Sequence, residues 1–311
     1  MREFLINEND SGQRLDRFIT KLMPRLPKSM LYKGLRKNCV KLNGRHVKDG
    51  AVFLNEGDTL ALYFKDEFFE PERGFVYVEP RLDIVFEDSN IIIINKAPGT
   101  VVHADDRGTA ATLVDMVKSY LYKNGGYDPA GENSFSPALC NRLDRNTGGL
   151  VIAAKNAAAL RCMNKLIRER RVRKYYMAIA EGYPESRGHL EGMAERGGRV
   201  TRIKGSAAPG AKAVSLDYRT LKKKDGYSLL EIELHTGRTH QIRAQLSAAG
   251  YPLAGDTKYG AGSGRYRQAL WSVRLEFDSL EPESPLGYLG GRSFSVEAPF
   301  EKEFTDGIYI T

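Results

Sequence analysis

The stretch LLEIELHTGRTHQIRAQLSAAGYPLAGDTKYG, residues 229–260, carries the pattern on which the fold of this chain depends. Apolar and acidic residues alternate from Leu230 to Leu234, which predicts a β-strand with one buried face. A dense group of polar residues follows the strand directly, and it includes Arg238 and Arg243. Both guanidiniums cannot be buried without anionic partners, because an arginine stays charged in proteins. The stretch therefore predicts a sheet with a polar site at the end of one strand, suited to a carboxylate or a phosphate.

A second polar turn lies in ALCNRLDRNTGGLVIAAK, residues 138–155, just before a buried strand predicted over 150–154. Its small residues would let a ligand approach the backbone closely. The tetrapeptide Arg-Leu-Asp-Arg occurs here at 142–145 and also at 14–17, where it opens an amphipathic helix and a structural role is sufficient. In the later copy, Asp144 either forms a surface ion pair with the arginines beside it or faces a ligand.

The remaining elements alternate between strand and helix without a regular strand-helix-strand repeat. VFEDSNIIIINKAPGTVVH, residues 85–103, predicts two strands broken by turns, and helices are predicted over 112–123 and 156–170. This mixture predicts an α+β fold with a mixed, largely antiparallel sheet. The stretch between Ser186 and Lys212 is rich in Gly, Lys and Arg and poor in apolar residues, so we expect a mobile loop there.

A smaller unit is predicted to precede the main domain. We place it at residues 1–65, with a linker at 66–75 and a larger domain at 76–311. The linker sequence DEFFEPERGF mixes charges with Pro and Gly and shows no clear period. Within the small unit, the Asn43-Gly44 pair lies between two short alternating runs and predicts a β-hairpin.

Two helices are also predicted in the small unit. Asp10 and Ser11 are the expected capping residues of the first helix. The second helix runs from Lys28 to about Lys37 and turns a basic face outward. The basic residues on that face are Lys28, Lys33, Arg36 and Lys37. They are candidate phosphate contacts for a nucleic acid, although a charge run of this kind is equally typical of a merely solvated face.

Composition narrows the class of protein. The 311 residues include 47 Lys+Arg and 39 Asp+Glu, which gives a net charge of +8 and a weak indication of a polyanionic partner. Hydrophobic residues make up 41% of the chain and supply a sizeable core, which argues against disorder along its whole length. The longest aliphatic run, residues 91–94, is far shorter than the roughly 20 residues that cross a bilayer. We therefore expect a cytoplasmic protein that does not bind membranes.

The sequence lacks the patterns typical of several common kinds of site. Three cysteines without a CxxC pair predict neither a disulfide framework nor a structural zinc site. His235 and His240 have no third ligand at a usual spacing, so no metal site is expected. The chain contains neither a GxSxG elbow nor a Walker loop, which argues against a serine hydrolase and a nucleotide hydrolase.

Four segments together resemble the RluA-type family of RNA pseudouridine synthases. Their sequences are VFEDSNIIIINKAPGTVVH, NRLDRNTGGLVIAAK, RKYYMAIAEG and TGRTHQIRAQLSAAGYPLAGDTKYG. The N-terminal unit is similar to the small RNA-binding module of ribosomal protein S-four, through RLDRFI, the basic second helix, VKLNGRHV and EGDTL. The resemblance implies isomerisation of uridines in structured RNA without a cofactor. It also implies that the substrate is large-subunit ribosomal RNA, with transfer RNA as the second candidate. We further expect a monomer without an obligate protein partner.

The resemblance also assigns roles to residues of this chain. Asp144 is the expected catalytic carboxylate, and Arg243 is its expected ion-pair partner. Tyr176 is the expected active-site tyrosine, with Tyr175 as the other candidate. Arg142 is expected to occupy the space that a flipped base leaves. Asp144 would either add to the uracil ring or assist departure of the base at the ribose, and both alternatives remain open.

The chain departs from the usual family pattern at Asn141, Gly148 and Trp271-Ser272, where His, Ser and a His-Ala pair are usual. None of these changes removes an expected catalytic group. Two other functions compete with the one that the resemblance implies. A catalytically vestigial RNA-binding or ribosome-assembly factor is disfavoured because all three expected catalytic residues are present. A carboxylate-dependent glycoside hydrolase is disfavoured because a second carboxylate motif is missing.

Overall fold

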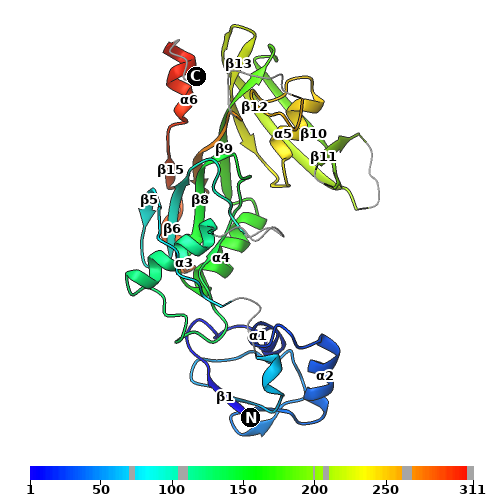
Figure 1. Cartoon of the computed structure of the whole chain (residues 1–311), viewed down its shortest axis with the longest axis vertical. Helices are drawn as coiled ribbons and strands as arrows, with labels where there is room; N and C mark the ends of the chain where they lie inside the picture. The colour runs from blue at the N-terminus through cyan, green and yellow to red at the C-terminus, as the bar shows by residue number, and fades with distance from the viewer. Residues whose placement is uncertain (70–73, 104–110, 199, 206–209, 261–267, 307–311) are drawn as a thin grey trace. The chain divides into compact units, whose positions relative to one another are not determined.

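The computed structural model describes residues 1–69, 74–103, 111–198, 200–205, 210–260 and 268–306 (Figure 1). The chain divides into two units. The first comprises Met1–Pro80, Val114–Ala138 and Ala154–Leu160, and the second comprises Arg81–Leu113, Leu139–Ala153 and Arg161–Thr311. The predicted domain boundaries at residues 65 and 75 remain a prediction, and residues 70–73 of the predicted linker lie outside the described part of the chain.

The first unit contains a small antiparallel sheet and two helices with a shared core. In spatial order the strands of the sheet are β1 (Arg2–Leu5), β4 (Thr59–Leu62), β2 (Val40–Leu42) and β3 (Arg45–His46). The helices are α1 (Leu15–Leu22) and α2 (Lys28–Arg36). Apolar residues at helical spacing on α1 and α2 pack with the buried residues of β2 and β4. This core includes Leu15, Phe18, Ile19, Leu31, Leu35, Val40, Leu60 and Leu62.

The turn between β2 and β3 confirms the hairpin predicted from Asn43-Gly44. The φ angle is 51° at Asn43 and 76° at Gly44, and a two-residue turn between antiparallel strands requires such left-handed conformations. The Asn43 side chain also donates to Asp58 at 2.8 Å and accepts a hydrogen bond from the Thr59 amide at 2.9 Å. The hairpin is thereby tied to the start of β4.

The start of α1 differs from the expectation that Asp10 and Ser11 cap this helix. Arg14 occupies the N-cap position, and no side chain caps the helix by a hydrogen bond. Asp10 instead accepts hydrogen bonds from Asn133 at 2.7 Å and Ser134 at 2.6 Å. The Asp10 carboxylate therefore binds a segment more than 120 residues away, and it does not cap the helix as the local pattern predicted.

The larger sheet contains eleven strands, counted over the described residues. Nine of them follow in the spatial order β11, β10, β12, β13, β9, β14, β8, β6 and β5, while β15 pairs with β14 and β7 pairs with β8. Their bounds are β5 (Ile84–Glu87), β6 (Ile91–Lys96), β7 (Ala138–Leu139), β8 (Gly148–Ala154), β9 (Val172–Glu181), β10 (Arg187–Gly197), β11 (Val200–Lys204), β12 (Lys212–Lys224), β13 (Tyr227–Leu234), β14 (Leu270–Phe277) and β15 (Ser293–Ser295).

The other helices are short and follow or connect these strands. Their bounds are α3 (Leu113–Lys123), α4 (Ala157–Arg168), α5 (Gln241–Ala248) and α6 (Pro299–Asp306), with single 3₁₀ turns η1 (Asp66–Phe68) and η2 (Gly287–Leu289). The helices predicted over 112–123 and 156–170 correspond to α3 and α4, and they are confirmed. α5 packs against β10 and β11 (Figure 1).

Strand directions in the larger sheet confirm the predicted α+β fold with a mixed, largely antiparallel sheet. β9 runs antiparallel to both β13 and β14, whereas β14 pairs in parallel with β8. In the β9–β13 register, Tyr176 lies opposite Ile232 and Tyr175 lies opposite Glu233. Successive residues of a strand point to opposite faces. The two tyrosines therefore lie on different faces of the sheet.

Gly148 and Gly149 make room for β14, and not for a ligand as their position in the sequence suggested. They pair with Trp271 and Ser272. A Cβ atom on Gly148 would lie 2.4 Å from the Trp271 ring, and one on Gly149, where φ is 104°, would lie 2.2 Å from the Ser272 backbone oxygen. Two of the departures from the family pattern are therefore linked, because the missing side chain at Gly148 accommodates the large ring of Trp271.

The stretch between Ser186 and Lys212 forms strands over most of its length, so the expectation of a mobile loop is wrong there. β10 and β11 form an antiparallel pair with Gly197 opposite Val200, and β10 also pairs with β12. Residues 199 and 206–209 lie outside the described part. β11 is an edge strand, and polar residues are compatible with such a position. The polar composition of this edge strand is the reason why the sequence pattern resembled that of a loop.

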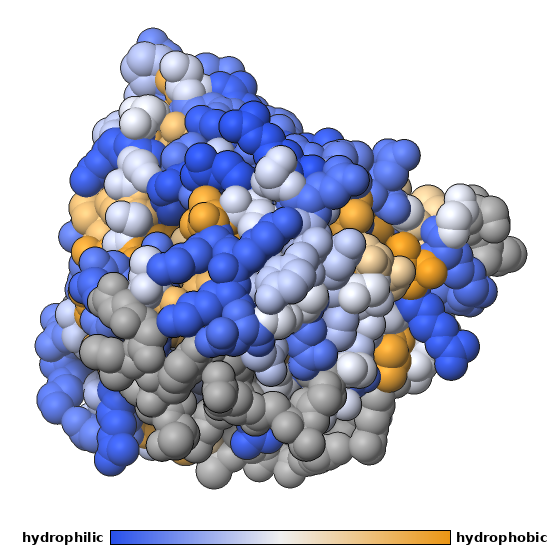
Figure 2. All heavy atoms as spheres, turned by 90° about the horizontal axis from the view of Figure 1, so that it is seen from above, coloured by the Kyte–Doolittle hydropathy of each residue, from blue (hydrophilic) through white to orange (hydrophobic). Residues whose placement is uncertain are grey.

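Polar residues prevail on the face that Figure 2 shows. Most of its coloured residues are hydrophilic, and the hydrophobic ones form separate patches. In the part of the chain that the structure describes, no helix combines the length and the apolar character needed to cross a membrane.

Candidate active site

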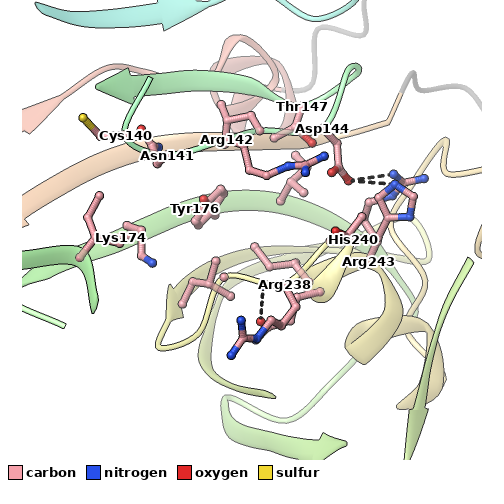
Figure 3. Close-up of a pocket in the computed structure, with 18 residues that line it drawn as sticks. Cys140, Asn141, Arg142, Asp144, Thr147, Lys174, Tyr176, Arg238, His240 and Arg243 are labelled. Atoms are coloured by element: carbon pink, nitrogen blue, oxygen red, sulfur yellow. Dashed lines mark hydrogen bonds and ion pairs between the residues drawn. The ribbon is translucent and has the colours of Figure 1, made fainter. Parts of the chain in front are cut away.

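A pocket in the second unit brings together the two polar turns that the sequence singled out (Figure 3). The turn that joins β7 to β8 supplies residues 140–144 and Thr147, and β9 supplies Lys174 and Tyr176. The segment between β13 and α5, together with the first turn of α5, supplies residues 237–243. Strand pairing places these elements next to one another, although they lie far apart in the sequence.

Asp144 forms an ion pair with Arg243 in this pocket. Arg243 Nη1 lies 2.9 Å from Asp144 Oδ2, and the Asp144 side chain is 15% exposed. The Thr147 amide donates a hydrogen bond to the Asp144 carbonyl at 3.1 Å, which closes the turn that carries the carboxylate. The structure therefore shows a carboxylate paired with a residue 99 positions away, and not the local surface ion pair that the sequence left open.

Arg243 is fixed by a second carboxylate, that of Asp256. Its Nε and Nη2 atoms donate to the two Asp256 oxygens at 2.6 and 2.9 Å, in the bidentate arrangement that guanidinium and carboxylate favour. The Asp256 side chain is 1% exposed and that of Arg243 is 7% exposed. The Tyr259 ring lies 4.9 Å from the Arg243 Cζ atom. Arg243 therefore has little freedom, and its remaining Nη1 atom is directed at Asp144.

His240 lies near the same oxygen of Asp144 that Arg243 contacts. Its backbone is left-handed, with φ at 55°, where the chain enters α5. His240 Nδ1 is 2.9 Å from the Tyr259 hydroxyl, and Nε2 is 3.8 Å from Asp144 Oδ2. Burial lowers the pKa of His240, so the imidazole is neutral at neutral pH. Arg243 is thus the charged group that compensates Asp144.

Hydrogen bonds of Gln241 explain why polar residues follow the buried strand β13. The Gln241 side chain donates to the Ser215 carbonyl at 3.1 Å and accepts from the Thr236 hydroxyl at 2.8 Å and the Arg238 amide at 3.1 Å. These bonds hold the segment before α5 against β12. The first turn of α5, which carries Arg243, is thereby placed in the pocket.

Tyr176 lines the pocket, whereas Tyr175 lies on the opposite face of β9. Tyr176 is 5% exposed, and burial raises the pKa of its phenol to about 12. Tyr175 stacks against Arg274, whose Cζ atom is 4.0 Å from the ring centre. Of the two candidates that the sequence offered, Tyr176 is therefore the one that lines the same pocket as Asp144.

Exposed basic residues surround the pocket and also occur in the other unit. Arg142 and Arg238 line the pocket and are exposed, so Arg243 is the arginine of the β13–α5 stretch that is buried. Lys174 lines the pocket as well, and burial lowers its pKa. The basic residues predicted on the second helix are all exposed on α2 or directly after it: Lys28, Lys33, Arg36 and Lys37.

The earlier copy of Arg-Leu-Asp-Arg has a different environment from the copy in the pocket. Arg14 donates to both oxygens of Asp16, at 3.1 and 2.7 Å, and the Tyr32 hydroxyl donates to the same carboxylate at 3.1 Å. Asp16 is 7% exposed within the first unit. Its local partners satisfy it, in agreement with the structural role that the sequence indicated.

Sequence reasoning missed Lys96, which holds the turn that carries Asp144. Lys96 is 1% exposed, and its ammonium donates to the carbonyl oxygens of Ala97, Thr100 and Arg145 at 3.0 to 3.1 Å. Burial lowers its pKa to about 8, an effect that the charge of Asp144 opposes. The sequence signal was a lysine at the end of a strand that begins with four isoleucines, where a buried cation needs several acceptors.

Replacing Lys96 with methionine is expected to lower the free energy of unfolding by about 3 kcal/mol, because three carbonyl oxygens lose a charged donor. We also expect slower turnover, since one of these carbonyls belongs to Arg145, next to Asp144. Urea denaturation followed by circular dichroism measures the first effect. Lys65→Met is the matched control, because that side chain is 81% exposed. An equal change in the two variants would contradict the role assigned to the Lys96 ammonium.

Asp256 is the second residue that the sequence did not identify. A signal for it existed, because a buried arginine requires an anionic partner. The sequence could not show which of many acidic residues fulfils this requirement. In this pocket, Asp144 and Asp256 pair with Arg243, and His240 contacts Tyr259. The arrangement therefore supplies a charged carboxylate, a flat phenol and basic groups for an anionic substrate.

Known proteins are similar in sequence to this chain over most of its length. Residues 90–248 match the RNA pseudouridylate synthase family. A Mycoplasma capricolum protein named Uncharacterized RNA pseudouridine synthase is 30% identical over 299 residues, which cover 94% of this chain and 96% of the relative. The Ribosomal large subunit pseudouridine synthase D of Zymomonas mobilis is 30% identical over 291 residues, which cover 91% of this chain and 88% of the relative.

One solved structure shows the same fold. The protein titled Human RNA Pseudouridylate Synthase Domain Containing 1 matches with a TM-score of 0.52 and 24% sequence identity. The match covers 74% of this chain and 96% of that chain.

Proposed function

Because the chain belongs to the RNA pseudouridylate synthase family, we propose that Asp144 is the carboxylate with which it converts uridine to pseudouridine, and that its substrate is large-subunit ribosomal RNA. The observation that carries the first part is the Asp144–Arg243–Asp256 arrangement. It pairs one carboxylate with a guanidinium and orients it at the wall of a pocket, while the other carboxylate is buried and anchors the guanidinium. An exposed, unpaired aspartate would lack this orientation.

The reaction rearranges bonds within one nucleotide. The bond between ribose C1′ and uracil N1 breaks, the uracil turns, and C1′ bonds to C5, while C5 loses a proton and N1 gains one. No electron donor or acceptor takes part. Asp144 acts either by adding to the ring or by assisting departure of the base at the ribose, and each role requires an ionised carboxylate. Arg243 supplies the opposite charge that such a carboxylate needs in a partly dry pocket.

Tyr176 is proposed as the surface on which the uracil rests. Its ring lines the pocket, and a detached base must be held while it turns. Removal of the C5 proton by Tyr176 would require its phenolate. Burial raises the pKa of this phenol to about 12, so the phenol of the free protein is protonated at neutral pH.

Arg142 is proposed to fill the space that the target base leaves in its stack. The residue is exposed beside the pocket, two positions before Asp144. Extruding a base costs a few kcal/mol and costs least in loops and bulges. We therefore expect the target uridines to lie in loops and bulges of a folded RNA. A guanidinium can compensate part of that cost by stacking and hydrogen bonding with the bases that remain.

Large-subunit ribosomal RNA is the proposed substrate, and transfer RNA is the alternative. The name of the Zymomonas mobilis relative supports the first. Mapping pseudouridines in cellular RNA from strains with and without the gene tests the proposal. We expect sites in large-subunit ribosomal RNA to disappear with the gene. Loss of sites in transfer RNA alone would contradict the proposed substrate.

The N-terminal region is proposed to be an RNA-binding module similar to that of ribosomal protein S-four. We propose residues 1–65 as the module, 66–75 as the linker and 76–311 as the catalytic domain. Two helices, a hairpin and an exposed basic helix face support this assignment. The basic residues Lys28, Lys33, Arg36 and Lys37 would contact phosphates.

Replacing Lys28, Lys33 and Lys37 together with glutamine is expected to weaken RNA binding and to make it less sensitive to salt. Each lost phosphate contact removes about 0.7 to 0.9 from the slope of log affinity against log salt, so the slope should fall by about 2. Filter binding over a series of salt concentrations measures it. The matched control replaces Lys222, Lys223 and Lys224, which lie in β12. Equal slopes for both triple variants would contradict the assignment.

A further inference from the structure

Three metal-ligating side chains meet on the face of the larger sheet opposite the candidate active site. His189 on β10 lies directly across from Asp217 on β12, and Asp217 lies across from Glu233 on β13. Glu233 in turn pairs with Tyr175, which faces away from the pocket. This row of side chains therefore lies on the face of the sheet opposite the pocket. Their neighbours along each strand point to the pocket face.

His235 joins this group from the next row of the sheet. It follows β13, and its amide donates to the Ser215 carbonyl at 3.3 Å, which places it beside β12. It is two positions after Glu233, so a strand-like path returns its side chain to the same face. The sheet topology thus brings Asp217 to His189, 28 positions before it, and to His235, 18 positions after it.

Asp217 holds both imidazoles. His189 Nδ1 lies 2.5 Å from Asp217 Oδ1, and His235 Nε2 lies 2.8 Å from Asp217 Oδ2. The side chains of His189, Asp217 and His235 are 51%, 50% and 28% exposed. Their ligand atoms all lie within 4.8 Å of one another. The three side chains are therefore close together and open to solvent on one side.

The chemistry of this donor set suits a transition-metal ion of the Zn²⁺ class. Two imidazole nitrogens and one carboxylate oxygen are common ligands of Zn²⁺, whereas Mg²⁺ and Ca²⁺ favour oxygen atoms only. Ligands about 2.0 to 2.1 Å from a tetrahedral ion are about 3.3 Å apart. Separations of 2.5 and 2.8 Å, within a set that spans 4.8 Å, therefore need only small side-chain rotations to accept an ion.

The charged groups around the cluster favour a cation overall. Glu191 Oε2 lies 3.7 Å from His189 Nε2, and Glu233 lines the same hollow. Arg187 and Arg219 line it as well, but Arg219 is paired with Glu231 at 3.0 Å. Two carboxylates thus remain near the cluster in addition to Asp217.

We propose that His189, Asp217 and His235 bind one divalent transition-metal ion, with Zn²⁺ as the probe, and that this ion cross-links β10, β12 and the segment after β13. The sequence predicted no metal site because His235 and His240 lack a third ligand at a usual spacing. The proposed ligands come from three separate segments, so their spacing carries no such signal. The site lies away from Asp144 and plays no part in the proposed reaction.

Isothermal titration of the full-length, EDTA-treated protein with ZnCl₂ tests the proposal. We expect one equivalent of Zn²⁺ per chain, and affinity at least ten-fold weaker in His189→Gln and in His235→Gln. His46→Gln is the matched control, because His46 is exposed on β3 in the other unit. Pseudouridine formation should be the same in all four proteins. Unchanged Zn²⁺ affinity in both cluster variants would overturn the proposal.

A second measurement needs no variant and therefore does not depend on whether variants fold. The chain has five histidines, and the imidazole resonances of each can be followed by NMR during a Zn²⁺ titration of the unaltered protein. Zn²⁺ should shift the ring signals of His189 and His235 and leave those of His46 and His240 in place. Absence of binding, or shifts centred on His240, would overturn the proposal without affecting the proposed catalytic function of Asp144.

Discussion

Replacing Asp144 with asparagine is expected to abolish pseudouridine formation, with a fall in turnover of about 10⁴-fold or more. The amide keeps the size of the side chain and can still accept a hydrogen bond from Arg243. It has no negative charge, so it can neither add to a uracil ring nor stabilise a developing positive charge at the ribose. Release of tritium from uridine labelled at C5 measures the reaction, because C5 loses its hydrogen when the new bond forms.

The control for this variant is Asp16→Asn, which alters the same tetrapeptide in the other unit. Asp16 pairs with Arg14 and Tyr32 and does not line the pocket, so turnover should stay within about two-fold of the unaltered protein. RNA affinity should persist in Asp144→Asn, since phosphate contacts supply most of it. Full turnover in Asp144→Asn would refute the proposed role of this carboxylate.

Replacing Arg243 with methionine is expected to remove activity and to destabilise the protein by about 3 to 5 kcal/mol. The stability loss arises from Asp256, which is 1% exposed and would keep a buried charge without a partner. The activity loss arises from Asp144, which would lose both its countercharge and its orientation. Urea denaturation and the tritium-release assay measure the two effects separately.

Two further variants separate the stability effect from the catalytic effect. Arg238→Met changes an exposed arginine of the same segment, and its free energy of unfolding should change by less than about 0.5 kcal/mol. The double variant Arg243→Met with Asp256→Asn removes the buried charge, so it should regain part of the lost stability but none of the activity. Recovery of activity in the double variant would contradict the idea that Arg243 acts on Asp144.

Local patterns in the sequence predicted the elements that depend on local physics. Asn43-Gly44 specified a hairpin because both positions need left-handed backbone conformations that Asn and Gly adopt readily. α3 and α4 lie where the sequence predicted helices, and the α+β class followed from the mixture of strands and helices. The prediction failed for most of 186–212, because a stretch rich in Gly, Lys and Arg forms β10 and β11 there. β10 is hydrogen-bonded to β12, and β11 is hydrogen-bonded to β10.

The site was only partly accessible from the sequence. The resemblance pointed to Asp144, Tyr176 and Arg243, and the structure brings these three residues to one pocket. The sequence indicated only that a buried lysine or arginine needs partners. It did not show that Lys96 holds the turn before β8 or that Asp256 holds the guanidinium. Both roles depend on pairs of residues that only the folded chain brings within hydrogen-bond distance.

The two copies of Arg-Leu-Asp-Arg show where the information in the sequence ends. Sequence alone determined that each copy places an aspartate between two arginines, and that the first opens a helix. Only the tertiary structure decided that Asp16 stays with Arg14 while Asp144 pairs with Arg243 from α5. The physical reason is that the order of strands in the sheet fixes which distant charge reaches a carboxylate, and neighbouring residues along the chain do not encode that order.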